Sequence, residues 1–474
     1  MKTKITGTDL MSIGYKQNEI LGLVLKVANS NYEELNSDEI LALFKKVLDY
    51  PESFLDDEIL ENLAAKMIGA VNAPADETIA LNENPNDYVV YGSQHIEQGA
   101  HNQMKVAMQL PVTVAGALMP DAHQGYGLPI GGVLATKNAI IPYGVGVDIG
   151  CRMALSIYDI PADHFEENRS KYQRELIAHT KFGAGHGFHG QHKAEHEVLD
   201  KSEFNMTPMV KQLKDKAWSQ LGTSGGGNHF VEFGILEFDE KDEILGIEKG
   251  KYVALLTHSG SRGFGATLAG HYTKLARQLT KLPAEAQNLA WLSLDSQEGQ
   301  EYWMAMNLAG DYASACHQII HDKMAKAIGA EVLAKIENHH NFAWKEIWNG
   351  EEVIVHRKGA TPAGKGVMGI IPGSMAAPGF LVRGKGEERA INSASHGAGR
   401  QMSRTQAVKS ITKNQMREVL KDNNVTLIGA GRDEAPMAYK DITVVMESQK
   451  ELIDVVAKFT PKIVRMADDG SRED

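Results

Sequence analysis

Glycine-rich turns break the chain into short apolar runs from about residue 88 onward, and this pattern constrains the fold more than any other feature. Glycines recur closely at residues 125–127, 144–146, 225–227 and 263–265. Residues 253–257 and 353–355 are typical of strands, whereas longer helical patterns occupy residues 301–324 and 447–458. Because strands and helices mix without a regular β–α–β rhythm, the sequence predicts an α+β fold rather than a doubly wound sheet.

The first 80 residues have a helical pattern instead. Apolar residues follow helical spacing after Ser37 and again after Asp56, and Pro51 separates the two segments. We therefore expect a helical N-terminal extension over residues 1–80 and one large domain of mixed sheets and helices over residues 81–466. Residues 467–474 are acidic and poor in apolar side chains, which predicts a loose tail.

The sequence predicts a soluble protein of a reducing cytoplasm. No run of 18 apolar residues occurs, and the N-terminus lacks the apolar core of a signal peptide. Only two cysteines, Cys151 and Cys316, occur among 474 residues, which excludes a disulfide framework. We expect a cytoplasmic monomer with no membrane partner.

The distribution of charge is uneven. The net charge of −12 argues against a polyanionic partner. Residues 356–417, however, hold eleven Lys or Arg and only two acids, Glu387 and Glu388, which leaves this stretch at +9. A basic segment in an acidic protein indicates a face that meets phosphates, although a solvated helix face explains such a cluster equally well.

Five short segments place potential metal ligands beside glycine or other turn-forming residues: 146–151, 225–229, 257–262, 339–341 and 395–400. Such turns expose an imidazole, and imidazole, thiolate and carboxylate together suit a divalent transition metal. Asp148 and Cys151 are three residues apart and can reach the same metal or neighbouring ones, and a thiolate can bridge two cations. A lone histidine of this kind is usually structural, but the five segments together predict a metal centre.

Two glycine-rich loops, residues 372–375 and 396–400, leave backbone N–H groups open to an anion. Glycine loops alone are weak evidence, since turns need glycine. Beside a metal centre and a basic segment they indicate a nucleotide or a nucleic-acid backbone. The histidine-rich residues 183–196 could form a second metal site, but a polar loop at the rim of the cleft is the favoured interpretation.

The same segments resemble a known family, the RtcB-type RNA-splicing ligases. The resemblance runs in order from about residue 88 to 460 and is carried by residues 119–125, 144–151, 226–230, 258–263, 339–341, 371–375, 395–404 and 434–442. It implies a GTP-dependent ligase with two Mn²⁺ ions that acts in RNA repair or tRNA splicing. Such enzymes open a 2′,3′-cyclic phosphate end to a 3′-phosphate and transfer GMP to it, after which a 5′-hydroxyl end displaces the GMP.

The resemblance also implies roles for individual residues. His396 would attack the α-phosphate of GTP and carry GMP on its ring. The metal ligands would be Asp148, Cys151, His229, His258 and His340, with Cys151 shared by both ions. The guanylate pocket would be lined by Asn228, Phe230, Glu232, Asn341, Pro372, Gly373, Ser374, Met375, Gly397, Ala398, Gly399 and Tyr439. Arg262, Arg400 and Arg404 would face RNA phosphates.

Some positions depart from the family pattern. Family members commonly end in Val-Lys-Gly, which this chain lacks, and Gly379 stands where a pocket serine is frequent. Two other functions remain as alternatives. A metal-dependent phosphodiesterase that processes RNA ends would use water as its nucleophile and would not need His396. A non-catalytic RNA-binding paralogue would have no need for the complete ligand set.

Overall fold

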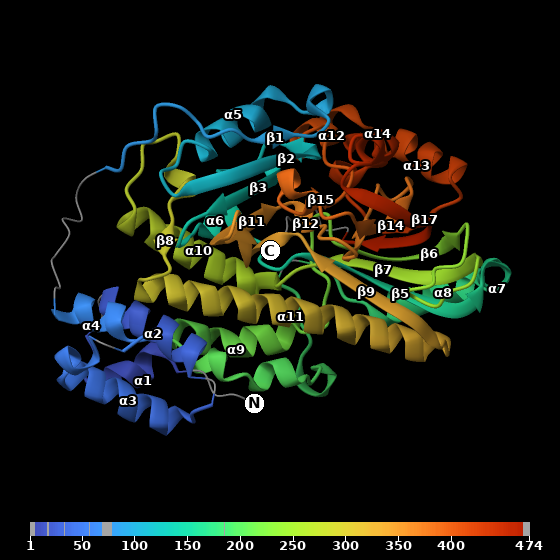
Figure 1. The fold of residues 1–474 in the computed structure, drawn as a ribbon. Helices are drawn as coiled ribbons and strands as arrows, with labels where there is room; N and C mark the ends of the chain where they lie inside the picture. The colour runs from blue at the N-terminus through green and yellow to red at the C-terminus, as the bar shows by residue number, and fades with distance from the viewer. Residues whose placement is uncertain are drawn as a thin grey trace.

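The computed structural model describes residues 5–16, 19–32, 34–55, 57–68, 78–183 and 185–467. Two β-sheets form the body of this part of the chain, and helices pack around them (Figure 1). The mixture of largely antiparallel sheets with helices confirms the predicted α+β fold. Of the predicted acidic tail, only Ala467 lies within the described residues.

The larger sheet has eight strands. Seven follow the order β13, β14, β17, β6, β7, β5, β9 with antiparallel neighbours, and β16 pairs parallel to β17. The strands are β5 (Arg152–Pro161), β6 (Phe230–Phe238), β7 (Gly250–Ser259), β9 (Val332–His339), β13 (Met368–Ile371), β14 (Gly379–Gly384), β16 (Thr426–Ile428) and β17 (Ile453–Met466).

The smaller sheet has five strands in the order β1, β2, β3, β11, β10. They are β1 (Val89–Val90), β2 (Thr113–His123), β3 (Ile130–Thr136), β10 (Asn341–Trp348) and β11 (Glu351–Lys358). Two strand pairs complete the β-structure, β12 (Ala360–Pro362) with β15 (Ser393–Ser395) and β4 (Ala139–Ile140) with β8 (Leu292–Ser293). The predicted strands at residues 253–257 and 353–355 are confirmed within β7 and β11.

The longest helix, α11 (Gln297–Ile328), crosses the whole body in Figure 1. Ser296 caps its start and Gly329, with a φ of +70°, ends it. The predicted helix over 301–324 is therefore confirmed. The other helices of the body are α5 (Gln98–Ala107), α6 (Pro142–Val145), α7 (Ala162–Glu167), α8 (Arg169–His179), α9 (Pro208–Gln220), α10 (Arg262–Leu279), α12 (Arg404–Ser410), α13 (Lys413–Asp422) and α14 (Ile442–Glu447).

The predicted helix over residues 447–458 is wrong. The helix α14 ends at Glu447, and residues 453–466 form β17, which pairs with β14 on one side and β6 on the other. Ile453, Ala457 and Phe459 are buried in this sheet, whereas Val455 is 55% exposed. Pairing along two neighbouring strands outweighs the local helical pattern here.

The N-terminal helices have an apolar core of their own. They are α1 (Gly7–Ser12), α2 (Glu19–Asn31), α3 (Ser37–Asp49) and α4 (Glu61–Ile68), and their buried side chains include Leu10, Val24 and Phe44. The helix α2 packs on α11, and Lys26 and Lys66 form ion pairs with Asp295 (3.5 and 3.6 Å) beside it. The division of the chain at residue 80 stays a prediction.

The contact between α2 and α11 makes a glycine prediction possible. A Cβ atom added at Gly22 would overlap the backbone of Ser296 and Gln297, which a side-chain rotation cannot relieve. We expect Gly22→Ala to destabilise the protein by about 1–3 kcal/mol, measured by urea unfolding and by proteolysis of the N-terminal helices. Gly270→Ala is the control, because that helical glycine has open space around it. Equal stability of both variants would contradict the contact.

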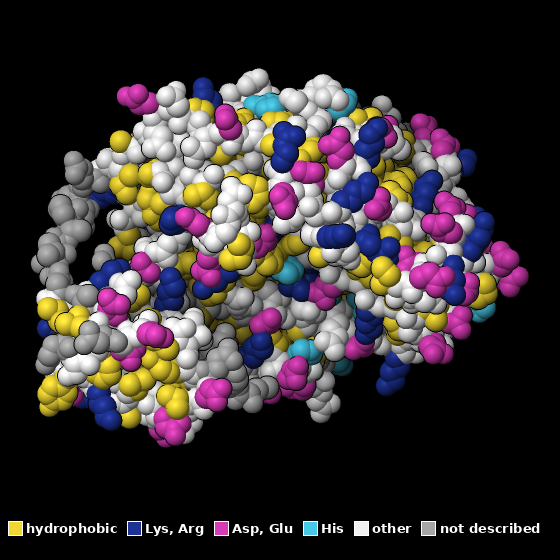
Figure 2. All heavy atoms as spheres, in the orientation of Figure 1, with side chains coloured by type: hydrophobic (Ala, Val, Ile, Leu, Met, Phe, Trp, Pro, Cys, Tyr) yellow, Lys and Arg dark blue, Asp and Glu magenta, His cyan; other side chains and the backbone are white. Residues whose placement is uncertain are grey.

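Figure 2 shows an apolar patch over the N-terminal helices, whereas charged side chains of both signs are scattered over the remaining surface in this view. Over the elements labelled α12, α13, β14 and β17 in Figure 1, basic side chains are interleaved with acidic ones. The basic segment therefore does not form a uniformly positive face on this side. Within the described residues, no helix combines the length and apolar character that a membrane span requires.

Candidate metal centre and nucleotide cleft

Five potential metal ligands meet at one edge of the larger sheet. Because β6, β7, β5 and β9 are antiparallel neighbours, the starts of β5 and β6 lie beside the ends of β7 and β9. Cys151 precedes β5, His229 precedes β6, and His258 is the penultimate residue of β7. His340 lies between β9 and β10, and Asp148 comes from the turn before Cys151. Residues far apart in sequence thus converge through strand register.

These side chains form two buried groups that share one sulfur atom. Cys151, His258 and His340 make one group, and Asp148, Cys151 and His229 make the other, with the ligand atoms of each within 4.8 Å of one another. Cys151 Sγ lies 3.1 Å from His258 Nε2 and 3.6 Å from His229 Nε2. His229 Nε2 lies 2.9 Å from Asp148 Oδ2. This is the arrangement expected for two neighbouring cations.

The hydrogen bonds of the histidines fix which ring nitrogens face the cluster. His229 Nδ1 donates to the Ser224 carbonyl (2.9 Å) and His258 Nδ1 donates to the Asn228 carbonyl (3.1 Å), since a carbonyl only accepts. The Nε2 atoms of both rings therefore face the cluster, that of His258 toward the Cys151 sulfur and that of His229 toward the Asp148 carboxylate. Burial lowers the pKa of His258 to about 3, so the ring is neutral. Converging lone pairs of this kind fit a transition-metal cation.

His396 lies at the end of β15 beside this cluster, and its ring centroid is 4.9 Å from that of His340. His396 Nδ1 donates to Oδ2 of Asp121 at 2.7 Å, and the backbone N–H groups of His396 and Gly397 donate to the same oxygen. Burial by itself would raise the pKa of Asp121, but the hydrogen bond from His396 and the nearby positive charge of Lys440 bring it below its usual value. An ionised, buried carboxylate therefore orients the imidazole.

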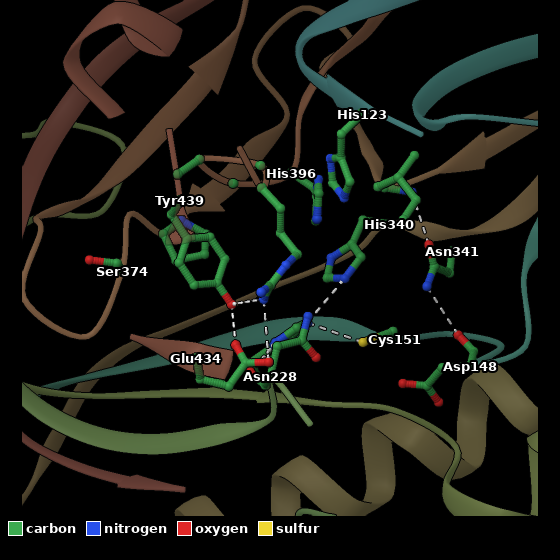
Figure 3. A pocket seen from close by; sticks show the side chains of 18 of the residues that line it. His123, Asp148, Cys151, Asn228, His340, Asn341, Ser374, His396, Glu434 and Tyr439 are labelled. Atoms are coloured by element: carbon green, nitrogen blue, oxygen red, sulfur yellow. Dashed lines mark hydrogen bonds and ion pairs between the residues drawn. The ribbon is translucent and has the colours of Figure 1, made fainter. Parts of the chain in front are cut away.

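A cavity of about 470 Å³ lies over these groups (Figure 3). It is lined by His396, by four of the predicted metal ligands and by all the residues predicted to form the nucleotide pocket. These residues are Asp148, Cys151, His258, His340, Asn228, Phe230, Glu232, Asn341, Pro372, Gly373, Ser374, Met375, His396, Gly397, Ala398, Gly399 and Tyr439. The fifth predicted ligand, His229, is fully buried behind the wall that Asp148 and Cys151 form. The structure thus brings together residues from 148 to 439.

Two of the three predicted RNA contacts also line the cavity, but they are already paired. Arg404 forms ion pairs with Asp433 (2.8 Å) and with buried Glu434. Arg400 lies 3.5 Å from Glu434 and stacks over the Tyr439 ring at 5.1 Å, and the Tyr439 hydroxyl donates to Glu434. Burial, followed by the charge of Glu434, raises the pKa of Tyr439 well above its ordinary value. The charges of this wall are therefore internally compensated.

The structure does not bring Arg262 to the cavity. Its side chain is fully buried at the start of α10 and is held by Thr223 Oγ1 at 3.3 Å. A Cβ at Gly225 would overlap its guanidinium group, so the turn at residues 223–225 covers it. The position of Arg262 gives no support to the prediction that it faces RNA phosphates. Its guanidinium instead packs against the turn that precedes His229.

Sequence reasoning assigned no role to four groups that line or support the cavity. Asp121 and His123 belong to a segment that was used only for its resemblance, and Lys358 was counted only as part of the basic segment. Burial lowers the pKa of Lys358 to about 7, and its Nζ donates to the carbonyls of Tyr126 (2.6 Å) and Tyr143. Glu434 is the fourth. The signal that could have revealed these groups is a polar side chain inside an otherwise apolar segment.

A buried hydrogen-bond chain supports β7 from behind. His317 Nε2 donates to the Ser259 carbonyl (3.1 Å), so its Nδ1 accepts from the Thr257 hydroxyl (2.5 Å). His321 Nε2 donates to Thr257 Oγ1 (2.8 Å), and its Nδ1 accepts from the Ser156 hydroxyl (2.7 Å). Burial lowers the pKa of His317 to about 4 and that of His321 to about 3. Both neutral rings thus fix the strand that carries His258 to α11.

The histidine-rich loop takes no part in the centre. Among the residues the structure describes, His186, His189, His192 and His196 belong to neither ligand group and do not line the cavity. His196 accepts a hydrogen bond from the Val198 backbone and contacts Gln318 at 3.1 Å. A loop outside the metal centre agrees with the interpretation favoured from the sequence.

A cavity that joins a buried cysteine-and-histidine cluster to an oriented histidine defines a candidate enzyme active site, and the cluster could hold a metal ion. The family model of tRNA-splicing ligase RtcB matches residues 103–467. The chain therefore belongs to the RtcB family of RNA ligases. The family match begins after the N-terminal helices, which end at Ile68.

Individual relatives agree with this assignment. The chain is 34% identical over 396 residues to the RNA-splicing ligase RtcB of Escherichia coli K12, covering 76% of this chain and 92% of that protein. It is 30% identical over 421 residues to the tRNA-splicing ligase RtcB of Nanoarchaeum equitans, covering 73% and 87%. It is also 29% identical over 444 residues to the tRNA-splicing ligase RtcB of Archaeoglobus fulgidus, covering 78% and 91%.

Proposed function

We propose that this ligase joins RNA ends that carry a 3′-phosphate or a 2′,3′-cyclic phosphate to 5′-hydroxyl ends, through a covalent His396–GMP intermediate. The reaction would use GTP and two Mn²⁺ ions and serve RNA repair or tRNA splicing. The single observation that carries the proposal is the position of His396, which is oriented by Asp121 and lies against His340 of the metal-ligand cluster.

The orientation of His396 makes it a competent nucleophile. Because the protonated Nδ1 of His396 donates a hydrogen bond to Asp121, Nε2 carries the lone pair. In the first step Nε2 bonds to the α-phosphorus of GTP, the bond from that phosphorus to the bridging oxygen breaks, and pyrophosphate leaves. The Asp121 carboxylate balances the positive charge that develops on the ring. It acts here as the orienting group of a nucleophile rather than as a proton acceptor.

The two ligand groups would be filled by Mn²⁺, held by Asp148, Cys151, His229, His258 and His340, which would neutralise the phosphates and polarise the phosphorus. Between them the buried donors supply both hard and soft ligand atoms. The protein keeps these side chains in place through the backbone hydrogen bonds of His229 and His258.

The rest of the cavity suits a guanylate. Asn228 Oδ1 is buried without a hydrogen-bond partner, so a donor on the ligand can satisfy it. The glycine-rich residues 397–399 and residues 372–375 line the cavity together with His396 and would contact the phosphates. Phe230 and Glu232 also line it, and Phe230 would offer an aromatic surface to the base. Arg400 and Arg404 would exchange Glu434 for an RNA phosphate when the substrate enters.

In the second step the RNA 3′-phosphate attacks the phosphorus of His396–GMP, and the N–P bond breaks to restore the neutral imidazole. In the third step the 5′-hydroxyl attacks the activated RNA phosphate and loses its proton, and GMP leaves. A new phosphodiester bond joins the two RNA ends.

The test is self-labelling with GTP that carries a radioactive α-phosphate. We expect the wild-type protein with Mn²⁺ to acquire an acid-labile label and His396→Ala to acquire none, because the phosphoramidate forms on that ring. His186→Ala, in the loop outside the cavity, is the matched control and should label like the wild type. Equal labelling of His396→Ala and wild type would refute the ligase mechanism. Opening of a cyclic phosphate without joining would favour the phosphodiesterase alternative.

A further inference from the structure

A second cavity of about 860 Å³ adjoins the catalytic one. The two share the loop at residues 123–126 together with Ile130, Arg400 and Arg404, so they are two chambers of one hollow. His396 lies in the first chamber only. A ligand that fills both chambers would therefore run past the shared residues to reach His396.

Tyr126 lies on the border between the two chambers with its ring largely free. Its side chain is 70% exposed although it lines both cavities. Its only aromatic neighbour among the described residues is Tyr143, whose ring centroid is 6.3 Å away at an angle of 46°. One face of the Tyr126 ring is thus available to a planar ligand.

The backbone beneath this ring is fixed. The Tyr126 carbonyl accepts from Lys358 Nζ at 2.6 Å, and Gly125 exchanges two hydrogen bonds with the Gln103 side chain (2.6 and 3.0 Å). Gly127 has a φ of +71° and lies against the Asn288 backbone, a position that leaves no room for a Cβ. An exposed ring on an immobilised backbone loses little freedom when a ligand stacks on it.

The second chamber offers the chemistry of a nucleic-acid strand rather than of a small metabolite. Its walls combine apolar, amide and charged side chains, and the guanidinium of Arg404 lies at the border with the first chamber. The wall residues include Val444, Val445, Gln401, Gln406, Lys440, Glu97 and Asp441. Aromatic rings, amides and guanidinium groups are the groups that contact bases and phosphates of single strands. His396 does not line this chamber, so a strand whose end reaches His396 would place its remaining nucleotides here.

We propose that the second chamber holds the RNA strand and that Tyr126 stacks on the base of the nucleotide next to the joint. This inference rests on the proposed ligase function and adds to it the part of the cleft that grips the RNA. Stacking of a base on an aromatic side chain changes binding by roughly 10-fold to 100-fold. Tyr126→Ala is therefore expected to lower kcat/KM for ligation by about that factor, and Tyr126→Phe, which keeps the ring, by less than about threefold.

Abasic substrates make the test specific. With the wild-type protein and with Tyr126→Phe, removal of the base next to the 3′-phosphate or next to the 5′-hydroxyl should lower kcat/KM by the stacking factor in one of the two positions. With Tyr126→Ala the same removal should have no further effect. Tyr50→Ala, another exposed tyrosine (60%) on the N-terminal extension, is the control for surface changes.

The outcomes separate this inference from the ligase function. Absence of self-labelling with GTP in the wild type would refute the proposed function. Wild-type labelling and ligation, combined with an equal dependence on the base in Tyr126→Ala and wild type, would refute only the stacking role. A Tyr126→Phe variant as defective as Tyr126→Ala would also refute it, since the hydroxyl and not the ring would then matter.

Discussion

Replacing Cys151 by alanine is expected to abolish ligation and to lower the affinity for Mn²⁺ at both positions. Cys151 Sγ belongs to both ligand groups, so its loss leaves two ligands in each. Residues that merely orient metal ligands change metal affinity by about 10- to 100-fold, and loss of a shared ligand should exceed the upper value. The measurements are calorimetric titration with Mn²⁺ and the thiolate-to-metal absorption of the Co²⁺-substituted protein.

Cys316→Ala is the matched control, because Cys316 is the other buried cysteine and lies on α11 outside both ligand groups. This variant should keep the Co²⁺ absorption band and the stoichiometry of the metal. Thermal unfolding of both variants separates loss of metal from loss of fold. If Cys151→Ala bound two equivalents of Mn²⁺ with wild-type affinity, the assignment of the shared sulfur would be wrong.

Replacing Asp121 by asparagine is expected to slow formation of the His396–GMP adduct by about 10⁴-fold, the size of the effect when the orienting aspartate of a catalytic triad is changed to asparagine. An amide N–H directed at His396 Nδ1 would force the proton onto Nε2 and remove the lone pair that attacks GTP. The neutral amide would also fail to balance the charge on the ring. Rapid-quench measurement of adduct formation at saturating GTP provides the rate.

The Asp121→Asn substitution should leave metal binding unchanged, since Asp121 belongs to neither ligand group. Mn²⁺ titration of Asp121→Asn should therefore match the wild type. Asp311→Asn, an exposed change on α11, controls for the loss of one carboxylate. A wild-type rate of adduct formation in Asp121→Asn would show that the 2.7 Å contact has no part in catalysis.

The sequence indicated the residues of the metal-ligand cluster more clearly than the residues around it, such as Asp121. Glycine beside a histidine or cysteine marks the end of a strand, and neighbouring strands ending at one edge bring such residues together. Asp121 gave no comparable signal, because its partner His396 lies 275 residues away and the contact depends on how β2 meets β15. For a related reason, the buried position of Arg262 gives no support to the prediction that it faces RNA phosphates. A positive charge in a glycine-rich turn indicates phosphate binding only when the turn faces the cleft, and this depends on tertiary packing.

The helix predicted over residues 447–458 failed because strand pairing decides the outcome there. These residues contain a pattern compatible with a helix, but from Ile453 onward β14 and β6 offer hydrogen-bond partners on both sides. Sequence alone does not reveal that these partners lie there. The N-terminal helices were simpler, because local capping and spacing determine them, as the Asn36 cap of α3 illustrates.

The placement of one sulfur atom in both ligand groups has a consequence for how the centre fills. In the proposed centre of two Mn²⁺ ions, the first ion would displace the thiol proton, and the second would meet a sulfur that is already ionised. Loading of the two positions would thereby be coupled, and we expect half-filled protein to be scarce at intermediate manganese concentrations. Because both positions share this ligand, oxidation of Cys151 alone would release the metal from both of them and inactivate the enzyme.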